Sequence, residues 1–167
     1  MDLRAVQAPI KERYREEPGA SRITLSARGS QTDVPVACSV DIGRAVYEAE
    51  AHGGVGGPGT GACSGDLLLG ALAACAQITC QMVAAAMGIE ARRIEAVAEG
   101  DLDLSGTLGL RRDAPVGFES IRLRLEVDAP AASEEDLAAL ARKTERYCVV
   151  GQTLMSPPEL SVELVTE

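Results

Sequence analysis

Aromatic residues are almost missing from this 167-residue chain, which has no Trp, one Phe and three Tyr. So few rings leave little surface on which nucleotides or bases could stack. Basic residues are also in the minority, at 16 against 25 acidic residues. The formal net charge of −9 therefore argues against nucleic acid or an anionic membrane as the main partner.

Motifs for histidine or metal chemistry are scarce as well. The only His is His52, which lies in a Gly-rich segment, and no G-x-S-x-G or P-loop motif is present. The five Cys include no C-x-x-C pair, and Cys75 and Cys80 would lie about 140° apart around a helix, so we expect no metal and no bound cofactor. The first twenty residues lack an apolar signal segment, and the odd number of Cys does not suit a disulfide framework. We expect a cytoplasmic protein with free thiols.

Length and pattern predict one domain behind a short N-terminal arm. The charged residues 1–20 are expected to form the arm, and residues 21–167 the domain. The uncharged run 67–89 predicts one long helix with Ser64 as its N-cap and Gly88 at its end. Because apolar residues cover every face of this helix, we expect it to be buried. A membrane span is the alternative, but seven Ala and several polar residues inside the run favour a core helix.

Strand-like runs lie on both sides of this helix in the sequence. Three precede it and predict an antiparallel meander, two follow it as a hairpin, and one predicts a closing strand. They are residues 23–27, 34–40, 44–51, 93–104, 119–127 and 160–165. A second helix is expected to begin after Ser133, where acidic residues fill the first turn. The order of elements predicts an α+β fold with antiparallel sheets packed around a long buried central helix.

Thiol chemistry is the function that the residues do not exclude, although a Cys is by default an inert small apolar residue. Cys38 and Cys80 have nothing polar around them in the sequence and are expected in the core. Cys63 lies just before the long helix, where the helix dipole favours a thiolate, so it is a rival nucleophile. Cys75 lies inside the apolar helix, where burial keeps a thiol protonated unless a cation approaches. Cys148 follows a basic stretch at the end of the second helix.

Two cysteine motifs resemble those of a known superfamily. GPGTGACSGDLLLGALAACAQIT resembles the Gly-rich loop and central helix of the OsmC and organic hydroperoxide resistance (Ohr) proteins, and YCVVGQTL resembles their second cysteine motif. GDLDLSGTLG and VGFESIRLRLEV look like the paired strands between these motifs. The resemblance covers residues 22–166 and is closest to an OsmC-like branch with a CSGD motif. It implies an intertwined homodimer with its active sites at the subunit interface.

The resemblance also implies a two-cysteine peroxidase that defends against oxidative stress. Cys75 would attack the O–O bond of an organic or lipid hydroperoxide as a thiolate and become a sulfenic acid. Cys148 would then condense with it to a disulfide. An external dithiol, such as a lipoylated protein, would reduce this disulfide again.

The chain departs from the family pattern around Cys75. The family's peroxidases place a Glu ten residues earlier, where it orients an Arg that stabilises the thiolate; this chain has Gly65 there, and the adjacent Asp66 is shorter. Arg28 matches the family Arg by order, and Arg44 is the alternative. The alternative function is therefore a catalytically weak redox sensor or a protein that binds a hydrophobic ligand.

Overall fold

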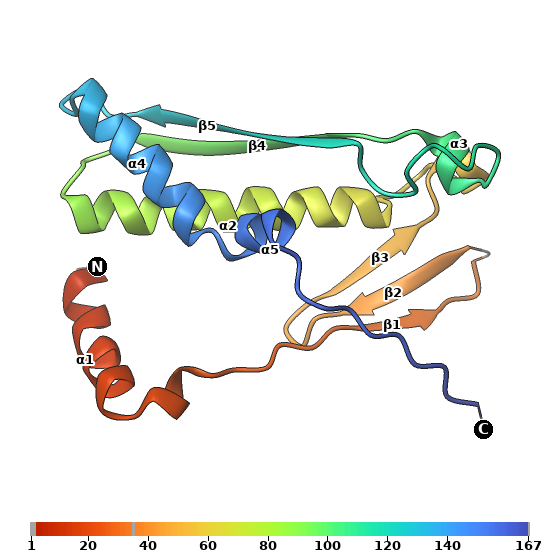
Figure 1. Cartoon of the computed structure of the whole chain (residues 1–167), viewed down its shortest axis with the longest axis horizontal. Helices are drawn as coiled ribbons and strands as arrows, with labels where there is room; N and C mark the ends of the chain where they lie inside the picture. Colours follow the sequence, from red (N-terminus) through yellow and green to blue (C-terminus); the bar gives the residue numbers. More distant parts are fainter. Residues whose placement is uncertain (1–2, 35, 167) are drawn as a thin grey trace. The chain divides into compact units, whose positions relative to one another are not determined.

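The computed structural model describes residues 3–34 and 36–166 and has the predicted α+β fold, with small antiparallel sheets and one long helix (Figure 1). By its internal contacts the chain divides into two compact units. The first unit contains Met1–Ala71 and Val97–Arg124, and the second contains Leu72–Ala96 and Leu125–Glu167.

The N-terminal arm of the first unit is helical. Helix α1 spans Leu3–Glu16, and the short 3-10 helix η1 spans Pro18–Ser21. No residue of α1 is buried. Of the arm predicted at residues 1–20, residues 1 and 2 lie outside the described chain.

The predicted antiparallel meander is confirmed, with strands β1 (Arg28–Gln31), β2 (Ala37–Asp41) and β3 (Val46–Glu50) in that order. The first strand predicted, residues 23–27, is wrong, because pairing begins only at Arg28. Arg28 lies opposite Asp41, the last residue of β2, so earlier residues have no partner on that strand.

The second predicted strand, residues 34–40, also begins later than expected, at Ala37. Val36 has a φ of +53°, in the left-handed region that β-branched residues rarely adopt, and this turn delays the strand. Residue 35 of this prediction lies outside the described residues.

The long helix α2 spans Ser64–Met87, so the predicted helix is confirmed. The predicted N-cap, Ser64, is wrong, because Cys63 is the N-cap. The Leu67 N–H donates to the Cys63 carbonyl at 3.1 Å. The Asp66 carboxylate reaches back to accept the Cys63 N–H at 2.9 Å, which ties down an otherwise free donor. At the other end Gly88 has the predicted helix-ending conformation, with a φ of +76°.

Burial of α2 within the single chain is confined to one face. Its buried residues are Leu72, Ala76, Cys80, Val83 and Ala84. Large apolar residues on other faces, among them Ile78 and Met82, are exposed. By length and composition α2 is also apolar enough to cross a membrane, which is weak evidence for a single helix. The packed face favours the prediction of a core helix, but the predicted burial of the whole helix is wrong for the single chain.

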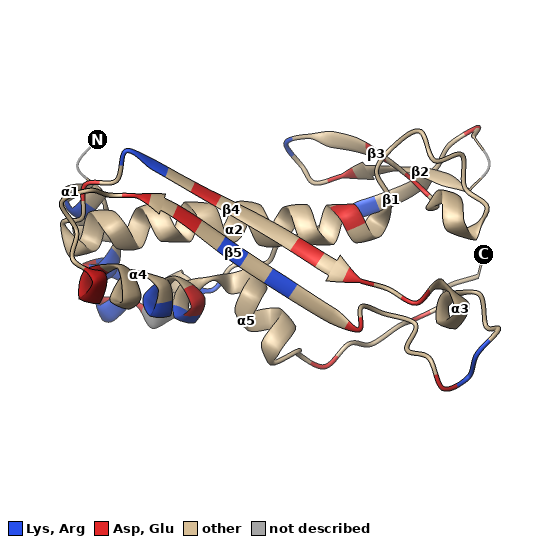
Figure 2. Cartoon of the chain, turned by 90° about the horizontal axis from the view of Figure 1, so that it is seen from above, with Lys and Arg blue, Asp and Glu red and all other residues tan. Residues whose placement is uncertain are grey.

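The second sheet consists of β4 (Arg93–Asp101) and β5 (Ser120–Asp128). Hydrogen bonds from the N–H of Arg92 to the carbonyl of Asp128, and from the N–H of Glu119 to that of Asp101, mark its two ends. Charged residues recur along both strands, mostly at every second position (Figure 2). Because alternate side chains of a strand face the same side, these charges lie on one face of the sheet. Within the first unit, the Arg122 guanidinium pairs with the Asp101 carboxylate.

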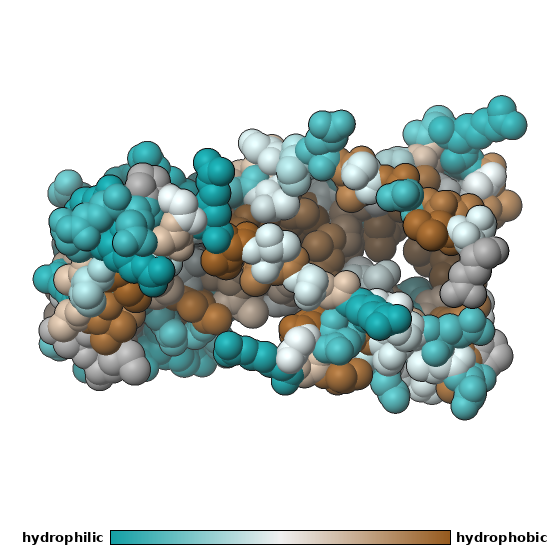
Figure 3. Space-filling model, turned by 90° about the horizontal axis from the view of Figure 1, so that it is seen from below, coloured by the Kyte–Doolittle hydropathy of each residue, from teal (hydrophilic) through white to brown (hydrophobic). Residues whose placement is uncertain are grey.

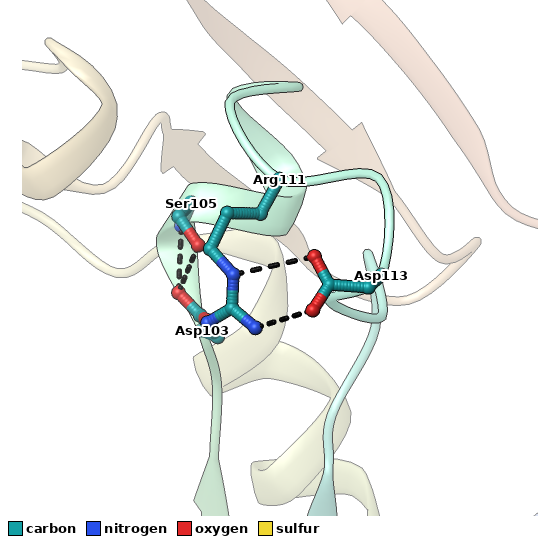
Figure 4. Close-up of polar contacts among 4 residues, drawn as sticks. All are labelled: Asp103, Ser105, Arg111 and Asp113. Carbon is teal, nitrogen blue, oxygen red and sulfur yellow. Dashed lines mark hydrogen bonds and ion pairs between the residues drawn. The ribbon is translucent and has the colours of Figure 1, made fainter.

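The connection between β4 and β5 is held together by a polar cluster in the first unit (Figure 4). It contains the short helix α3 (Leu104–Thr107), whose N-cap Asp103 accepts from the N–H of Ser105 at 2.9 Å. Arg111 pairs with both Asp103, at 3.2 Å, and Asp113, at 2.6 Å. The cluster fixes the loop without a further strand.

The second unit is completed by α4 (Glu134–Tyr147) and α5 (Val149–Met155). The predicted start of α4 is confirmed, with Ser133 and Asp136 forming a capping box. The core of this unit joins α2, α4 and the two strands through apolar side chains. They are Cys80, Val83, Ala84 and Leu140, surrounded by the partly buried Met87, Ile89, Ile94, Leu125 and Val127.

The closing strand predicted at residues 160–165 is wrong, since these residues have no regular structure. Leu160, Val162 and Leu164 are 86%, 90% and 88% exposed. Their alternation suits a strand, but a strand needs a neighbouring edge to pair with, and alternation alone does not supply one.

Candidate thiol site

Cys75 and Cys148 meet in the second unit, from different elements. Cys75 lies in α2 and is half-buried, whereas Cys148 is only 1% exposed. Cys148 ends α4, where its N–H donates to the Thr144 carbonyl at 2.9 Å. It also caps α5, because its sulfur accepts the Gly151 N–H at 3.4 Å. The two thiols are close enough for each to shift the pKa of the other.

The surroundings of Cys75 favour its thiolate. Burial by itself raises the pKa of the Cys75 thiol, but hydrogen-bond donors outweigh it and hold the pKa below its ordinary value. In decreasing order of effect, the donors are the Val150 N–H, the Cys148 thiol, the Thr79 hydroxyl and the Val149 N–H. All four donors are neutral groups, and two of them belong to the first turn of α5.

Cys148 is shifted in the opposite direction. Burial raises the pKa of its thiol, the Gly151 N–H partly opposes this, and the adjacent Cys75 sulfur raises it further. Two sulfurs that share a hydrogen bond cannot both ionise easily, because the second negative charge would face the first. Cys75 is therefore the thiol of the pair that ionises first, and Cys148 is the one that keeps its proton longer.

Helix α5 is the part of this site that the sequence analysis missed. Its seven residues lack a long apolar pattern, but Pro157 and Pro158 follow shortly after its end, a signal typical of a helix terminus. The glycine at position 151 also has a local structural reason. A Cβ there would lie 3.3 Å from the Cys148 sulfur, so glycine allows the capping sulfur to approach.

The remaining cysteine of α2, Cys80, is part of the apolar core as expected, with none of its surface exposed. Burial raises the pKa of its thiol, and the nearby Thr144 hydroxyl opposes the shift. That hydroxyl is itself buried and forms no hydrogen bond of normal geometry in the described chain. Cys80 is thus an apolar packing residue and a poor nucleophile.

Cys38 differs from its expected place in the core. It is half-buried on β2 and lines a cavity of about 300 Å³ in the first unit. Pro58, Thr60 and Gly61 of the Gly-rich loop also line this cavity.

Cys63, the rival nucleophile, has a capping role in the first unit. Both its N–H and its thiol hydrogen-bond to the Asp66 carboxylate, which lowers the pKa of Asp66; His52 adds a smaller effect in the same direction. The His52 Nδ1 accepts the Gly54 N–H at 3.0 Å. A thiol that donates to a carboxylate acts as a hydrogen-bond donor, which does not favour nucleophilic attack.

Gly65, at the position of the family's Glu, faces the only Phe of the chain. A Cβ on Gly65 would lie 3.4 Å from the Phe118 ring and 3.4 Å from the Cys63 sulfur. A side chain at residue 65 would therefore start in contact with the Phe118 ring and the Cys63 sulfur.

The predicted arginine partner of Cys75 stays a prediction. Arg28 is exposed on β1, and Arg44 is exposed between β2 and β3, both in the first unit, whereas Cys75 belongs to the second. In the described ranges, neither arginine forms an ion pair with Asp66.

Glu50 organises the Gly-rich loop and was not identified from the sequence. Its carboxylate accepts the N–H groups of Thr60 and Gly61 and the Thr60 hydroxyl, and its N–H donates to the Ala62 carbonyl at 3.0 Å. The Gly61 N–H is the main group that lowers the pKa of this carboxyl. An acidic residue before a glycine-rich run is only a weak signal, because several folded arrangements fit it.

The site is thus a pair of thiols on an α+β fold, with the pKa lowered at Cys75 on the long helix and raised at Cys148. Among residues 3–34 and 36–166, no group of three or more His, Cys, Asp or Glu side chains could hold a metal ion. The sequence profile of the OsmC-like protein family matches residues 57–163, a range that contains both cysteines. The chain belongs to the OsmC-like protein family.

Solved structures show the same fold at low sequence identity. An OsmC-like protein from Mycoplasma pneumoniae has a TM-score of 0.68 at 18% identity, with 81% of this chain and 89% of that chain covered. An organic hydroperoxide resistance protein OsmC from Legionella pneumophila has a TM-score of 0.60 at 15% identity, covering 81% and 92%. OhrB of Bacillus subtilis has a TM-score of 0.51 at 19% identity, covering 81% and 93%. A search of curated protein sequences found no match.

Proposed function

We propose that this protein is a thiol peroxidase that reduces organic hydroperoxides, with Cys75 as the peroxidatic residue and Cys148 as the resolving residue. The observation that carries the proposal is the pair of neighbouring thiols from α2 and α4, whose pKa values are shifted in opposite directions. Cys75 has the lowered pKa that a nucleophile needs, and Cys148 keeps the proton that a resolving thiol brings. Two of the structurally similar proteins named above are organic hydroperoxide resistance proteins.

The proposed reaction has three steps. The Cys75 thiolate attacks the distal oxygen of the hydroperoxide, the O–O bond breaks, and the alkoxide leaves and takes up a proton as an alcohol. The Cys148 thiol then attacks the Cys75 sulfenic acid, which forms the disulfide and releases water. A dithiol reductant, such as a lipoyl group, finally transfers two electrons to the disulfide by thiol–disulfide exchange and is itself oxidised.

The proposal includes a homodimer in a reducing cytosol. Apolar surface is exposed on the chain (Figure 3). Exposed apolar residues occur on α2, at Ile78 and Met82, and in the C-terminal segment, at Leu160, Val162 and Leu164. Apolar surface of this kind marks interaction sites in soluble proteins, and a second copy of the chain is the partner we propose. Free thiols in a working pair also need a compartment that keeps them reduced.

Steady-state turnover tests the proposed function. Reduced protein is mixed with a dithiol such as dihydrolipoamide and with cumene hydroperoxide, and the loss of cumene hydroperoxide is measured. Hydrogen peroxide serves as the competing substrate, and its loss is compared. We expect turnover with cumene hydroperoxide in the wild-type protein and in Cys80→Ser, and none in Cys75→Ser. Cys148→Ser should react once and stop. Unchanged turnover in Cys75→Ser would refute the assignment.

A second candidate is a redox sensor of slow turnover or a protein that binds a hydrophobic ligand. Gly65 favours it, because no acidic side chain is present at that position to orient an arginine. Stoichiometric oxidation without sustained turnover would support the sensor, and co-purified lipid with unreactive thiols would support the binding protein.

A further inference from the structure

The backbone of Cys148 is fixed on both sides, since this residue ends α4 and caps α5. Its N–H donates to the Thr144 carbonyl at 2.9 Å, and its carbonyl accepts the Gln152 N–H at 2.8 Å. The Gln152 side chain ties the two helices together by donating to the Glu145 carbonyl at 2.9 Å. With the backbone held in this way, the position of the Cys148 sulfur depends on the rotation of its side chain.

One hydrogen bond fixes that rotation. The Gly151 N–H donates to the Cys148 sulfur at 3.4 Å. An N–H in the first turn of a helix has no carbonyl partner within the helix, so this donor is available to a side chain. Cys148 is only 1% exposed, so solvent water competes little for its sulfur.

The absence of a side chain at residue 151 leaves room for the sulfur. A Cβ there would lie 3.3 Å from the Cys148 sulfur, closer than nonbonded heavy atoms normally pack. The same Cβ would lie 3.8 Å from a methyl group of Leu72, a buried residue of α2, so it has little room to move away from the sulfur. A side chain at this position would therefore crowd the sulfur by a few tenths of an ångström.

We propose that Gly151 is a positioning residue for Cys148, whose sulfur it holds in place for disulfide formation with Cys75. This role rests on the proposed function, because it takes Cys148 as the resolving thiol. In that step the Cys148 sulfur attacks the sulfur of the Cys75 sulfenic acid, the S–S bond forms, the S–O bond breaks, and water leaves with the thiol proton. Disulfide geometry is narrow, so this step is sensitive to where the sulfur lies.

A displaced Cys148 sulfur should slow the second step and leave the first unchanged. The atoms nearest to a Cβ at residue 151 belong to Cys148 and Leu72, and Cys75 is not among them. A misplacement of about 1 Å can cost about 10²-fold in rate, so a few tenths of an ångström should slow disulfide formation by roughly three- to tenfold. The Cys75 sulfenic acid then persists, and a second hydroperoxide molecule can oxidise it to the sulfinic acid while being reduced to the alcohol.

The experiment compares Gly151→Ala with the matched control Gly70→Ala, because Gly70 is a glycine of α2 at which a Cβ would meet no atom within 4 Å. Each reduced full chain reacts with cumene hydroperoxide at increasing concentration, and the concentration at which half of Cys75 becomes sulfinic acid is measured by mass spectrometry. It should be roughly three- to tenfold lower in Gly151→Ala than in the wild-type protein, with the initial consumption of hydroperoxide unchanged. Gly70→Ala should match the wild-type protein in both. An unchanged concentration in Gly151→Ala, or equal slowing of both steps, would overturn the proposal.

The hydrogen bond itself is tested without hydroperoxide. Exchange of the Gly151 amide is measured by NMR in the reduced wild-type protein, in Cys148→Ala, which lacks the acceptor, and in Cys148→Ser, which keeps one. The amide should exchange faster in Cys148→Ala only. Equal exchange in the wild-type protein and Cys148→Ala would overturn the proposal, and this measurement decides it if circular dichroism shows that Gly151→Ala does not fold.

The two measurements separate this role from the proposed function. If Cys75 of the wild-type protein does not react with hydroperoxide while the Gly151 amide depends on an acceptor at residue 148, the peroxidase assignment fails and the placement of the sulfur stands. If the wild-type protein forms the disulfide and Gly151→Ala is overoxidised no more readily, the peroxidase assignment stands and the role of Gly151 is refuted.

Discussion

Two glycines that face the same aromatic ring should respond oppositely to an added methyl group. A Cβ on Gly100 would lie 2.5 Å from two carbons of the Phe118 ring, whereas a Cβ on Gly65 would lie 3.4 Å from it. Carbon atoms pack at about 3.5–4.0 Å, so Gly100→Ala forces the ring to move by about 1 Å and Gly65→Ala does not. The comparison measures how tightly Phe118 closes this part of the first unit.

The magnitudes follow from packing and chain entropy. Overpacking of this kind costs about 1–3 kcal/mol, and replacing a Gly within a strand or helix returns roughly 0.5–1 kcal/mol. Gly100→Ala should therefore lower the free energy of unfolding by about 1–2 kcal/mol, and Gly65→Ala should leave it unchanged or raise it by up to about 1 kcal/mol.

Urea unfolding followed by circular dichroism at 25 °C measures both effects. Phe118→Leu serves as the background that removes the ring. In that background Gly100→Ala should lose most of its effect, with a coupling free energy of about 1 kcal/mol between the two sites. If Gly100→Ala unfolds like the original protein, or if its effect is the same without the ring, the close packing inferred for Phe118 is refuted.

Three further predictions test other parts of the structure. Cys75 should be alkylated faster than Cys80 at pH 7 by at least tenfold, as a ratio of peptide labelling rates, because burial raises the pKa of the Cys80 thiol while donors lower that of Cys75; equal rates would contradict this order. Glu50→Gln should speed hydrogen exchange of the loop amides that Glu50 now binds, and the control Glu48→Gln should not. The pKa of Asp101 is lowered to about 2, so its stabilising pair with the arginine of β5 is complete above pH 4 and should be lost as the pH falls through 2. Asp101→Asn should flatten the acid limb of the stability curve in that range, and an unaltered limb would exclude this contribution.

The parts of the fold that a local pattern determines were predictable from the sequence. The uncharged run before Gly88 specified a long helix, and the acidic first turn after Ser133 specified the start of α4. The strand predicted at residues 23–27 failed because strand pairing depends on where the partner ends, and β2 ends opposite Arg28. A pattern within one segment carries no information on the reach of another.

The candidate site was predictable only in its sulfurs. Cys75 and Cys148 follow from the cysteine motifs and the family resemblance. The groups that tune Cys75 do not, because two of them are backbone N–H groups of α5, a helix that has no periodic apolar pattern. Tertiary contacts, not residue types, assign these roles.

The most direct test of the central claim is the identity of the bond formed by one equivalent of organic hydroperoxide. Reduced protein is mixed with cumene hydroperoxide, free thiols are blocked within seconds, and peptides are mapped by mass spectrometry without reduction. We expect one disulfide between Cys75 and Cys148 in the wild-type protein, and a dimedone-reactive sulfenic acid on Cys75 in Cys148→Ser. Oxidation at Cys63 while Cys75 stays reduced would contradict it.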